Sequence, residues 1–262
     1  HFEYNLEAGK RLFVHFGAAN YETIVWLNGK RLGSHIGGFT PFCFEITDGL
    51  KSGTNSLVVK VDNKRKPEAV PTVNADWWNY GGITRPVNLI ETSETFIRDY
   101  YIQLDKNDKR TIEGWVQMDG KDAANNVTVE IPELKLKVEL LPNQDGYAEF
   151  SVKAKPELWS PENPKLYSVI LKSEQDMVLD EIGFRTIRTE GKKILLNDKE
   201  IFCRGVSIHE ETAYDNTRAY SADHADILLK WAKEMGCNFV RLAHYPHNEE
   251  MVKAAERMGL LV

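Results

Sequence analysis

Alternating apolar and polar residues dominate the first third of the chain. In the run Ser56–Val61 every second residue is apolar, which places one apolar row on a single face of an extended strand. The runs Tyr21–Leu27 and Lys30–His35 flank Asn28 and Gly29, and an Asn-Gly pair between apolar runs is the strongest local indication of a β-hairpin. No long helical pattern interrupts this region, so we predict that it forms a β-sandwich.

The same alternation continues through the middle of the chain, where turn residues such as Asp119-Gly120 and Asp145-Gly146 separate the apolar runs. Seven strands are predicted here: Ile97–Leu104, Arg110–Met118, Asn126–Ile131, Leu134–Leu140, Tyr147–Lys153, Lys165–Lys172 and Met177–Ile187. Seven short strands over about 95 residues are typical of an immunoglobulin-like sandwich. No pattern of chemically active residues is visible in this region, so a spacer or brace is the expected role.

The period of the apolar residues changes in the last quarter. A hairpin is predicted over Ile194–Cys203. Buried strands are predicted at Ile201–Ser207 and Asn238–Ala243, and a third strand is expected to begin at Leu260.

Two amphipathic helices are predicted to alternate with these strands. Ser221 and Asn248 are the expected N-caps, and Gly236 and Gly259 the expected C-terminal ends. The expected apolar stripes are Ile227, Leu228, Trp231 and Met235 in a helix near Ala222–Met235, and Met251, Val252, Ala255 and Met258 in a helix near Glu249–Met258. Strands that alternate with helices indicate a parallel sheet.

A histidine directly follows each of the first two parallel strands. His209 comes after the first and His244 after the second. Because the active site of a β/α barrel forms at the C-terminal ends of its strands, both are candidate functional residues, with a purely structural histidine as the alternative for His209. A doubly wound sheet is the alternative architecture, although no GxGxxG turn indicates a dinucleotide site.

Metal binding is disfavoured at these histidines. His244 and His247 are three residues apart, but Pro246 between them breaks regular structure, and no HExxH motif or cysteine accompanies them. We therefore expect no metal site within the chain.

One segment of the first region has an unusual composition. Asp76–Val87 reads DWWNYGGITRPV, and begins as a loop. Carboxylates accept hydrogen bonds from sugar hydroxyls, and aromatic faces stack on the C–H faces of sugars. For Asp76 we favour sugar recognition, whereas for Trp77, Trp78 and Tyr80 we favour packing against a neighbouring domain.

Composition narrows the class of protein. The 262 residues carry a net charge of −6 with 27% charged and 42% hydrophobic residues, without the basic face that nucleic acid requires. No run of about 18 apolar residues indicates a membrane span, so a soluble protein is expected. The three cysteines, Cys43, Cys203 and Cys237, are predicted to be buried free thiols. Because the chain begins at His1, a leader sequence is left open, and so is the choice between cytoplasm and periplasm.

Five segments together resemble glycoside hydrolase family 2, the family of β-galactosidases and β-glucuronidases. They are DWWNYGGITRPV (Asp76–Val87), LWSPENPKLY (Leu158–Tyr167), GFRTIR (Gly183–Arg188), CRGVSIHEE (Cys203–Glu211) and NFVRLAHYPHNEEM (Asn238–Met251). Their order and spacing match the family over nearly the whole chain. The resemblance implies a mainly β, multidomain fold: a jelly-roll sugar-binding domain at 1–91, an immunoglobulin-like sandwich at 92–187, and the start of a TIM (β/α)8 barrel at 188–262.

The resemblance also implies roles for four residues. Asp76 matches an acid that reaches from the jelly roll into the sugar site. Arg241 matches an arginine beside the nucleophilic carboxylate, where a guanidinium would keep that carboxylate ionised. His209 and His244 match histidines that line the pocket and stabilise the transition state.

The catalytic carboxylates themselves are not expected within this chain. In the family, the acid/base glutamate and the nucleophilic glutamate lie on later strands, here beyond Val262, so residues 1–262 alone are expected to be inactive. The expected partner is a β-linked oligosaccharide or glycoside, β-galactosides first and β-glucuronides next, and homo-oligomerisation is left open. No cofactor is required, although some members use Mg²⁺ held by later residues. The alternative to an enzyme is a non-catalytic carbohydrate-binding or structural β-sandwich module.

Overall fold

A computed structural model describes all residues, 1–262, and they form two compact units. The first unit comprises residues 1–92, 207–228 and 241–252, and the second comprises residues 93–206, 229–240 and 253–262. The expectation of a mainly β, multidomain fold is confirmed. The sequence-based domain limits of 1–91, 92–187 and 188–262 stay predictions.

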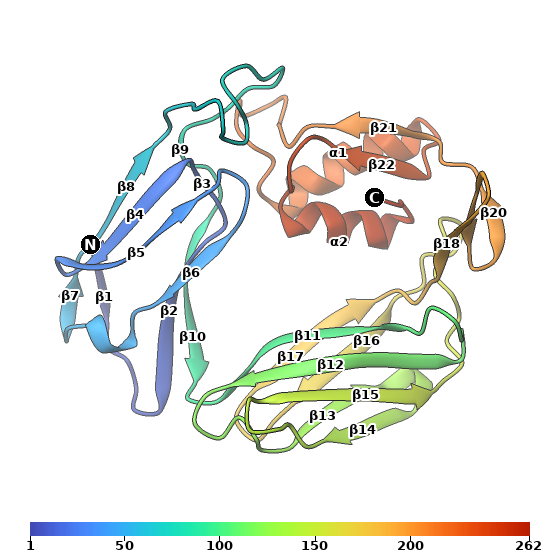
Figure 1. Ribbon diagram of the computed structural model, residues 1–262, viewed down its shortest axis with the longest axis horizontal. Helices are drawn as coiled ribbons and strands as arrows, with labels where there is room; N and C mark the ends of the chain where they lie inside the picture. The colour runs from blue at the N-terminus through green and yellow to red at the C-terminus, as the bar shows by residue number, and fades with distance from the viewer. The chain divides into compact units, whose positions relative to one another are not determined.

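Two three-stranded sheets make up most of the first unit, in the orders β5-β4-β8 and β10-β2-β6, with short pairs β1-β7 and β3-β9 (Figure 1). Its strands are β1 Phe2–Tyr4, β2 Lys10–Phe16, β3 Ala19–Asn20, β4 Glu22–Leu27, β5 Lys30–Ile36, β6 Phe42–Glu45, β7 Gly53–Asn55, β8 Leu57–Asp62, β9 Gly82–Ile83 and β10 Val87–Ser93, with a 3-10 turn η1 at Thr47–Gly49.

Period-two burial explains these strands. On β4 every second residue is buried, and alternate residues of β8 pack against the same core as Leu12, Val14 and Phe16 of β2. The predicted hairpin is confirmed, because Asn28 and Gly29 link β4 to β5 with φ values of 51° and 84°. Such left-handed angles are the ones that Asn-Gly turns adopt.

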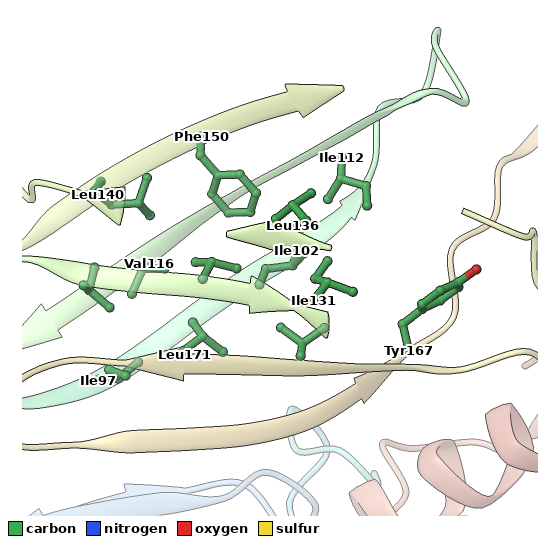
Figure 2. Packing of buried hydrophobic residues seen from close by; sticks show 14 of the residues in the cluster. Ile97, Ile102, Ile112, Val116, Ile131, Leu136, Leu140, Phe150, Tyr167 and Leu171 are labelled. Atoms are coloured by element: carbon green, nitrogen blue, oxygen red, sulfur yellow. The ribbon is translucent and has the colours of Figure 1, made fainter. Parts of the chain in front are cut away.

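The second unit contains an antiparallel sandwich of two sheets, β11-β12-β15 and β14-β13-β16-β17 (Figure 1). Its strands are β11 Phe96–Leu104, β12 Thr111–Asp119, β13 Val127–Ile131, β14 Leu136–Leu140, β15 Tyr147–Lys153, β16 Tyr167–Lys172 and β17 Met177–Ile182, with a 3-10 turn η2 at Pro132–Leu134. Figure 2 shows the apolar side chains between the sheets, where Val116, Ile131 and Leu171 are fully buried. Burial of side chains of this size stabilises a fold by about 1.5–3 kcal/mol each.

The predicted seventh strand, Met177–Ile187, is wrong in its second half. β17 ends at Ile182 because Phe184 turns inward and is fully buried beside Tyr167, with ring centroids 5.6 Å apart. Gly183 lies against Trp159, where an added Cβ would come within 2.7 Å of the indole. The chain therefore leaves the sheet at a position that requires glycine, and Ile187 begins a new strand.

A small three-stranded sheet, β18-β19-β20, follows in the second unit. Its strands are β18 Ile187–Glu190, β19 Lys193–Leu196 and β20 Lys199–Ile201. The predicted hairpin is confirmed, with Asn197 and Asp198 at φ values of 54° and 67° in its turn.

Two strand–helix pairs complete the chain. They consist of β21 Gly205–Ile208, α1 Ala222–Glu234, β22 Phe239–Leu242 and α2 Glu249–Met258. β21 and β22 pair, and Leu261 forms a parallel bridge with Phe239, which marks the expected third strand. Both predicted helices are confirmed. Neither helix has the length and apolar run that crossing a lipid bilayer requires.

Local hydrogen bonds fix the helix ends. The Ser221 hydroxyl accepts from the His224 amide at 3.2 Å, and Asn248 Oδ1 accepts from the Glu250 amide at 2.8 Å, as expected of N-caps. Gly236 and Gly259 follow the helices at φ values of 78° and 71°, as expected of C-terminal glycines.

The predicted buried strand Ile201–Ser207 is wrong in its first part and in its burial, since only its residues Gly205–Ser207 belong to β21, and none of these residues is buried. β20 ends at Ile201, Phe202 is 77% exposed, and β21 begins only at Gly205. The side chain of Asn238 holds the intervening turn, because its Oδ1 accepts from the Arg204 amide at 2.7 Å and its Nδ2 donates to the Phe202 carbonyl at 3.0 Å. These bonds replace a continuous ladder.

The predicted apolar stripes of the helices are partly wrong. In α1 the buried residues are Ala225, Leu229 and Ala232, whereas Ile227, Trp231 and Met235 are exposed. In α2 Met251 and Ala255 are buried as predicted, with Ala254, whereas Val252 is 48% exposed. Each helix carries two adjacent apolar stripes, and the row that includes small alanines is the buried one. Hydrophobic periodicity alone does not distinguish the two.

The prediction of three buried thiols is correct only for Cys237. Cys203 is half-buried and Cys43 is exposed. On β6, Phe42 and Phe44 face the core, so the period of two turns Cys43 outward.

Candidate active site

Two histidines lie side by side at the ends of paired strands. The Ala243 amide donates to the Ile208 carbonyl at 2.9 Å, and His209 and His244 each come one residue later. Their ring centroids are 5.3 Å apart in an edge-to-face arrangement. The structure therefore brings these two candidates together within the first unit.

A tryptophan from the sandwich of the same unit reaches this histidine pair. The Trp77 ring lies 5.2 Å from that of His244, 6.2 Å from that of His209 and 5.9 Å from that of Tyr245, measured between centroids. Trp77 belongs to the loop between β8 and β9. One aromatic face from the sandwich thus meets two titratable rings from the strand–helix part.

The loop that carries Trp77 is tied to the sandwich. Asn20, which is 1% exposed, donates through Nδ2 to Asn79 Oδ1 at 2.9 Å and to the Tyr80 carbonyl. The packing predicted for the loop's aromatic residues is incorrect for Trp78, which is 69% exposed. Trp77 and Tyr80 are half-buried.

Asp76 directly precedes Trp77 and has an exposed side chain. The ring of its neighbour Trp77 lies near both histidine rings. Its role in sugar recognition stays a prediction.

Arg241 sets the tautomer of His244. Its Nη2 lies 2.9 Å from His244 Nδ1. A guanidinium has only donors, so Nδ1 must accept, and a neutral His244 ring then carries its proton on Nε2. Both side chains are exposed, so His244 can offer an Nε2–H donor to a bound molecule.

His209 is held differently. Its Nδ1 is buried and has no hydrogen-bond partner, and the same is true of Trp77 Nε1. Tyr245 Oη is likewise buried without a partner, although buried polar atoms are normally paired.

A cluster of buried charges lies against Tyr245, and sequence reasoning missed it. Glu210 is fully buried, and its Oε2 lies 2.8 Å from Arg85 Nη2 and 3.4 Å from Arg218 Nη1. Arg218 also lies against the rings of Phe39 and Tyr245. The sequence gives no sign of this cluster, because Glu210 and its partner Arg85 are 125 positions apart and no local pattern reveals the pair.

Burial changes the pKa values of two neighbouring rings. Tyr245 stacks on Phe39 with centroids 4.1 Å apart, and burial raises the pKa of its phenol. His247 also stacks on Tyr245, with ring centroids 5.3 Å apart, and donates through Nε2 to the Ala243 carbonyl at 3.0 Å. Burial lowers the pKa of His247, which favours its neutral form.

The arrangement brings a hydrogen-bond donor and aromatic rings together, and its buried carboxylate, Glu210, is paired with two arginines. Glu210 is enclosed by cations, and Glu249 and Glu250 lie in the first turn of α2, where carboxylates suit the helix dipole. No group of three or more His, Cys, Asp or Glu residues could hold a metal ion.

Three family models match consecutive parts of the chain. They are the sugar binding domain of glycosyl hydrolases family 2 at residues 4–93, a further family 2 domain at 95–185, and the family 2 TIM barrel domain at 187–262. Together they cover almost every residue, in the order that the sequence motifs implied.

Similar proteins carry two kinds of names. A candidate β-glucuronidase of Formosa agariphila is 32% identical over 98% of this chain and 33% of its own length. A β-galactosidase of Thermoanaerobacter pseudethanolicus is 29% identical over 97% of this chain and 37% of its own length. The chain spans about a third to a half of the length of these first relatives.

Solved structures agree with the fold. An FMN-binding β-glucuronidase of Faecalibacterium prausnitzii superposes with a TM-score of 0.85 at 26% identity, over 99% of this chain and 43% of that one. A β-galacturonidase of Eisenbergiella tayi gives a TM-score of 0.80 at 29% identity, over 98% of this chain and 47% of that one.

Proposed function

The chain belongs to glycoside hydrolase family 2, and from that premise we propose that it forms the sugar-facing front part of a retaining exo-β-glycosidase. The observation that carries this proposal is the ring cluster of the first unit. His209 and His244 lie at strand ends, and Trp77 of the sandwich reaches them. The substrate would be a terminal β-linked sugar, with galactosides as the first expectation and glucuronides as the second; the names of the relatives include both activities.

Each residue of the cluster would have a distinct task. His244, kept as an Nε2–H donor by Arg241, would hydrogen-bond a sugar oxygen more strongly as charge develops in the transition state. Trp77 would offer a face for the sugar ring, and Asp76 would accept from its hydroxyls. Arg241 would in addition keep a nearby nucleophilic carboxylate ionised.

The bond-breaking step requires two further groups. Retaining hydrolysis uses a carboxylic acid that protonates the leaving oxygen and a carboxylate that attacks the anomeric carbon, about 5 Å apart. We propose that both glutamates come from residues outside 1–262. A glycosyl-enzyme would form and water would then hydrolyse it.

The test is turnover of a panel of aryl β-glycosides. The intact protein that carries this sequence should hydrolyse one of them, with the anomeric configuration retained, and residues 1–262 alone should hydrolyse none above background. Binding of the sugar without turnover by the intact protein would favour the carbohydrate-binding module instead. Turnover by residues 1–262 alone would overturn the assignment of the two glutamates.

A further inference from the structure

One buried guanidinium joins three segments of the first unit. Arg85 lies in the turn between β9 and β10, and its side chain is 5% exposed. Its Nη1 donates to the Phe39 carbonyl at 2.9 Å, and its Nη2 donates to Glu210 Oε2 at 2.8 Å and to the Pro246 carbonyl at 2.6 Å. The turn is thereby fastened to the strand-end segments that follow β21 and β22.

The carboxylate of this pair has a second task. Glu210 Oε1 accepts from the Asn248 amide at 2.7 Å, and Asn248 is the N-cap of α2. Glu210 therefore joins its own segment to the start of α2, while Arg85 joins both segments to the sandwich. All of these atoms belong to the first unit.

The tethered positions flank the two histidines. Glu210 directly follows His209, and Pro246 is two residues beyond His244. Between them Tyr245 is pressed against Phe39, whose carbonyl Arg85 also binds. The separation of the histidine rings, 5.3 Å, is thus set by a network that reaches neither ring directly.

We propose that Arg85 and Glu210 are positioning residues, through which the sandwich fixes the geometry of His209 and His244. The proposal rests on the proposed function. Neither the residue types of Arg85 and Glu210 nor their burial would by itself suggest a positioning role. A buried ion pair adds little net stability compared with apolar residues of the same volume. A planar guanidinium instead fixes the relative orientation of the groups that it binds, because its donors are held in one plane. A misplacement of a catalytic group by about 1 Å can lower the rate by about 10²-fold.

The experiment compares three variants of the intact protein. Arg85→Lys keeps a positive charge beside Glu210, but an ammonium cannot hold the Phe39 and Pro246 carbonyls in the same fork. Glu210→Gln keeps an acceptor for the Asn248 amide without the charge. The double variant Arg85→Met with Glu210→Leu replaces the pair by apolar volume, an exchange that buried pairs often tolerate. The matched control is Arg11→Met, which removes a partly exposed pair with Glu45 in the same unit, at 2.8 Å.

Two readouts separate positioning from folding. We expect kcat to fall by about 10- to 100-fold in Arg85→Lys and in the double variant, with KM within about twofold and the melting temperature little changed. Crystal structures of these variants should show the His209 and His244 rings displaced from their 5.3 Å separation. Arg11→Met should change neither readout.

Several outcomes would overturn the proposal. Wild-type kcat and unmoved rings in a folded Arg85→Lys or double variant would do so, and loss of the folded state in all three variants would assign the pair to folding alone. The ring geometry requires no turnover. Unmoved rings would therefore refute the positioning role, whereas an inactive wild-type protein with displaced rings in the variants would refute the proposed function only.

Discussion

The two units of the molecule fill their interiors with different kinds of side chain. In the second unit, a continuous apolar core lies between the sheets. The buried polar residues of the whole second unit are Thr95, Thr111 and Asn238. In the first unit, the buried residues include Arg85, Glu210, Arg218 and His247. The buried side-chain nitrogen and oxygen atoms that have no hydrogen-bond partner also all belong to the first unit.

The buried polar groups of the first unit suggest a different role from that of the apolar sandwich in the second unit. An unpaired buried polar group costs about 1–3 kcal/mol, so a sandwich that only braces its neighbours is expected to avoid such groups. A unit that presents hydrogen-bond donors to a ligand, as we propose for the first unit, would accept that cost, because local rules are broken mainly at functional sites. The comparison predicts that substitutions in the second unit change stability, and that substitutions at the ring cluster change rate.

The largest expected effect is on stability, in the second unit. Leu171 of β16 is fully buried, so Leu171→Ala should lower the free energy of unfolding by about 2–5 kcal/mol. The kcat of the folded molecules should be unchanged. Urea denaturation of the intact protein, with hydrogen exchange to locate the loss, measures this. Leu179→Ala, at a position of β17 that is 66% exposed, is the control and should stay within about 0.5 kcal/mol of wild type.

The second expected effect is on rate: in the first unit, kcat should fall while stability hardly changes. His244→Ala should lower kcat by on the order of 10²-fold or more, the scale lost with one transition-state donor. Stability should hardly change, because the side chain is exposed. Steady-state kinetics on an aryl β-glycoside tests this, with His224→Ala in the first turn of α1 as the control. Wild-type rates in the His244 variant would remove the contrast between the two units.

Much of the fold could be predicted because its determinants are local. The Asn28-Gly29 turn, the caps at Ser221 and Asn248, and the alternation in the strands all act within a few residues. The errors occurred where a distant partner decides. β17 ends early because Phe184 enters the core, and the turn before β21 depends on the side chain of Asn238, more than 30 positions away.

The residues of the candidate site show the same contrast between local and distant determinants. His209 and His244 were predicted because strand ends are recognisable from the pattern of apolar residues. The ion pair of Arg85 and Glu210 joins residues 125 positions apart, and a glutamate beside another glutamate carries no mark of burial. Sequence patterns thus indicated the two candidate histidines, but not the buried ion pair beside them.

A third effect should appear in sugar affinity. Asp76→Ala should weaken binding of the sugar by about 1–3 kcal/mol, typical of a hydrogen bond to a charged group, with kcat less affected than in the His244 variant. Inhibition constants for a simple monosaccharide product measure it. Asp48→Ala removes another exposed carboxylate of the first unit and should have no effect. Equal affinity in the Asp76 and Asp48 variants would limit the site to the ring cluster.

The smallest expected effect is a pH dependence confined to the first unit. Burial lowers the pKa of His247, Arg85 and His209 lower it further, and Glu210 and the Ala243 carbonyl oppose the change. The unfolded chain, with an ordinary value near 6.5, then binds the proton more readily than the folded chain. The stability contributed by neutral His247 is complete above about pH 6.5 and is lost as the pH falls below it, by at most about 1.4 kcal/mol per pH unit for one proton. His247→Gln can still donate to the Ala243 carbonyl but cannot titrate. Thermal unfolding between about pH 7.5 and 5 should therefore show a shallower decline for this variant, and parallel curves would mean that another group carries the pH dependence.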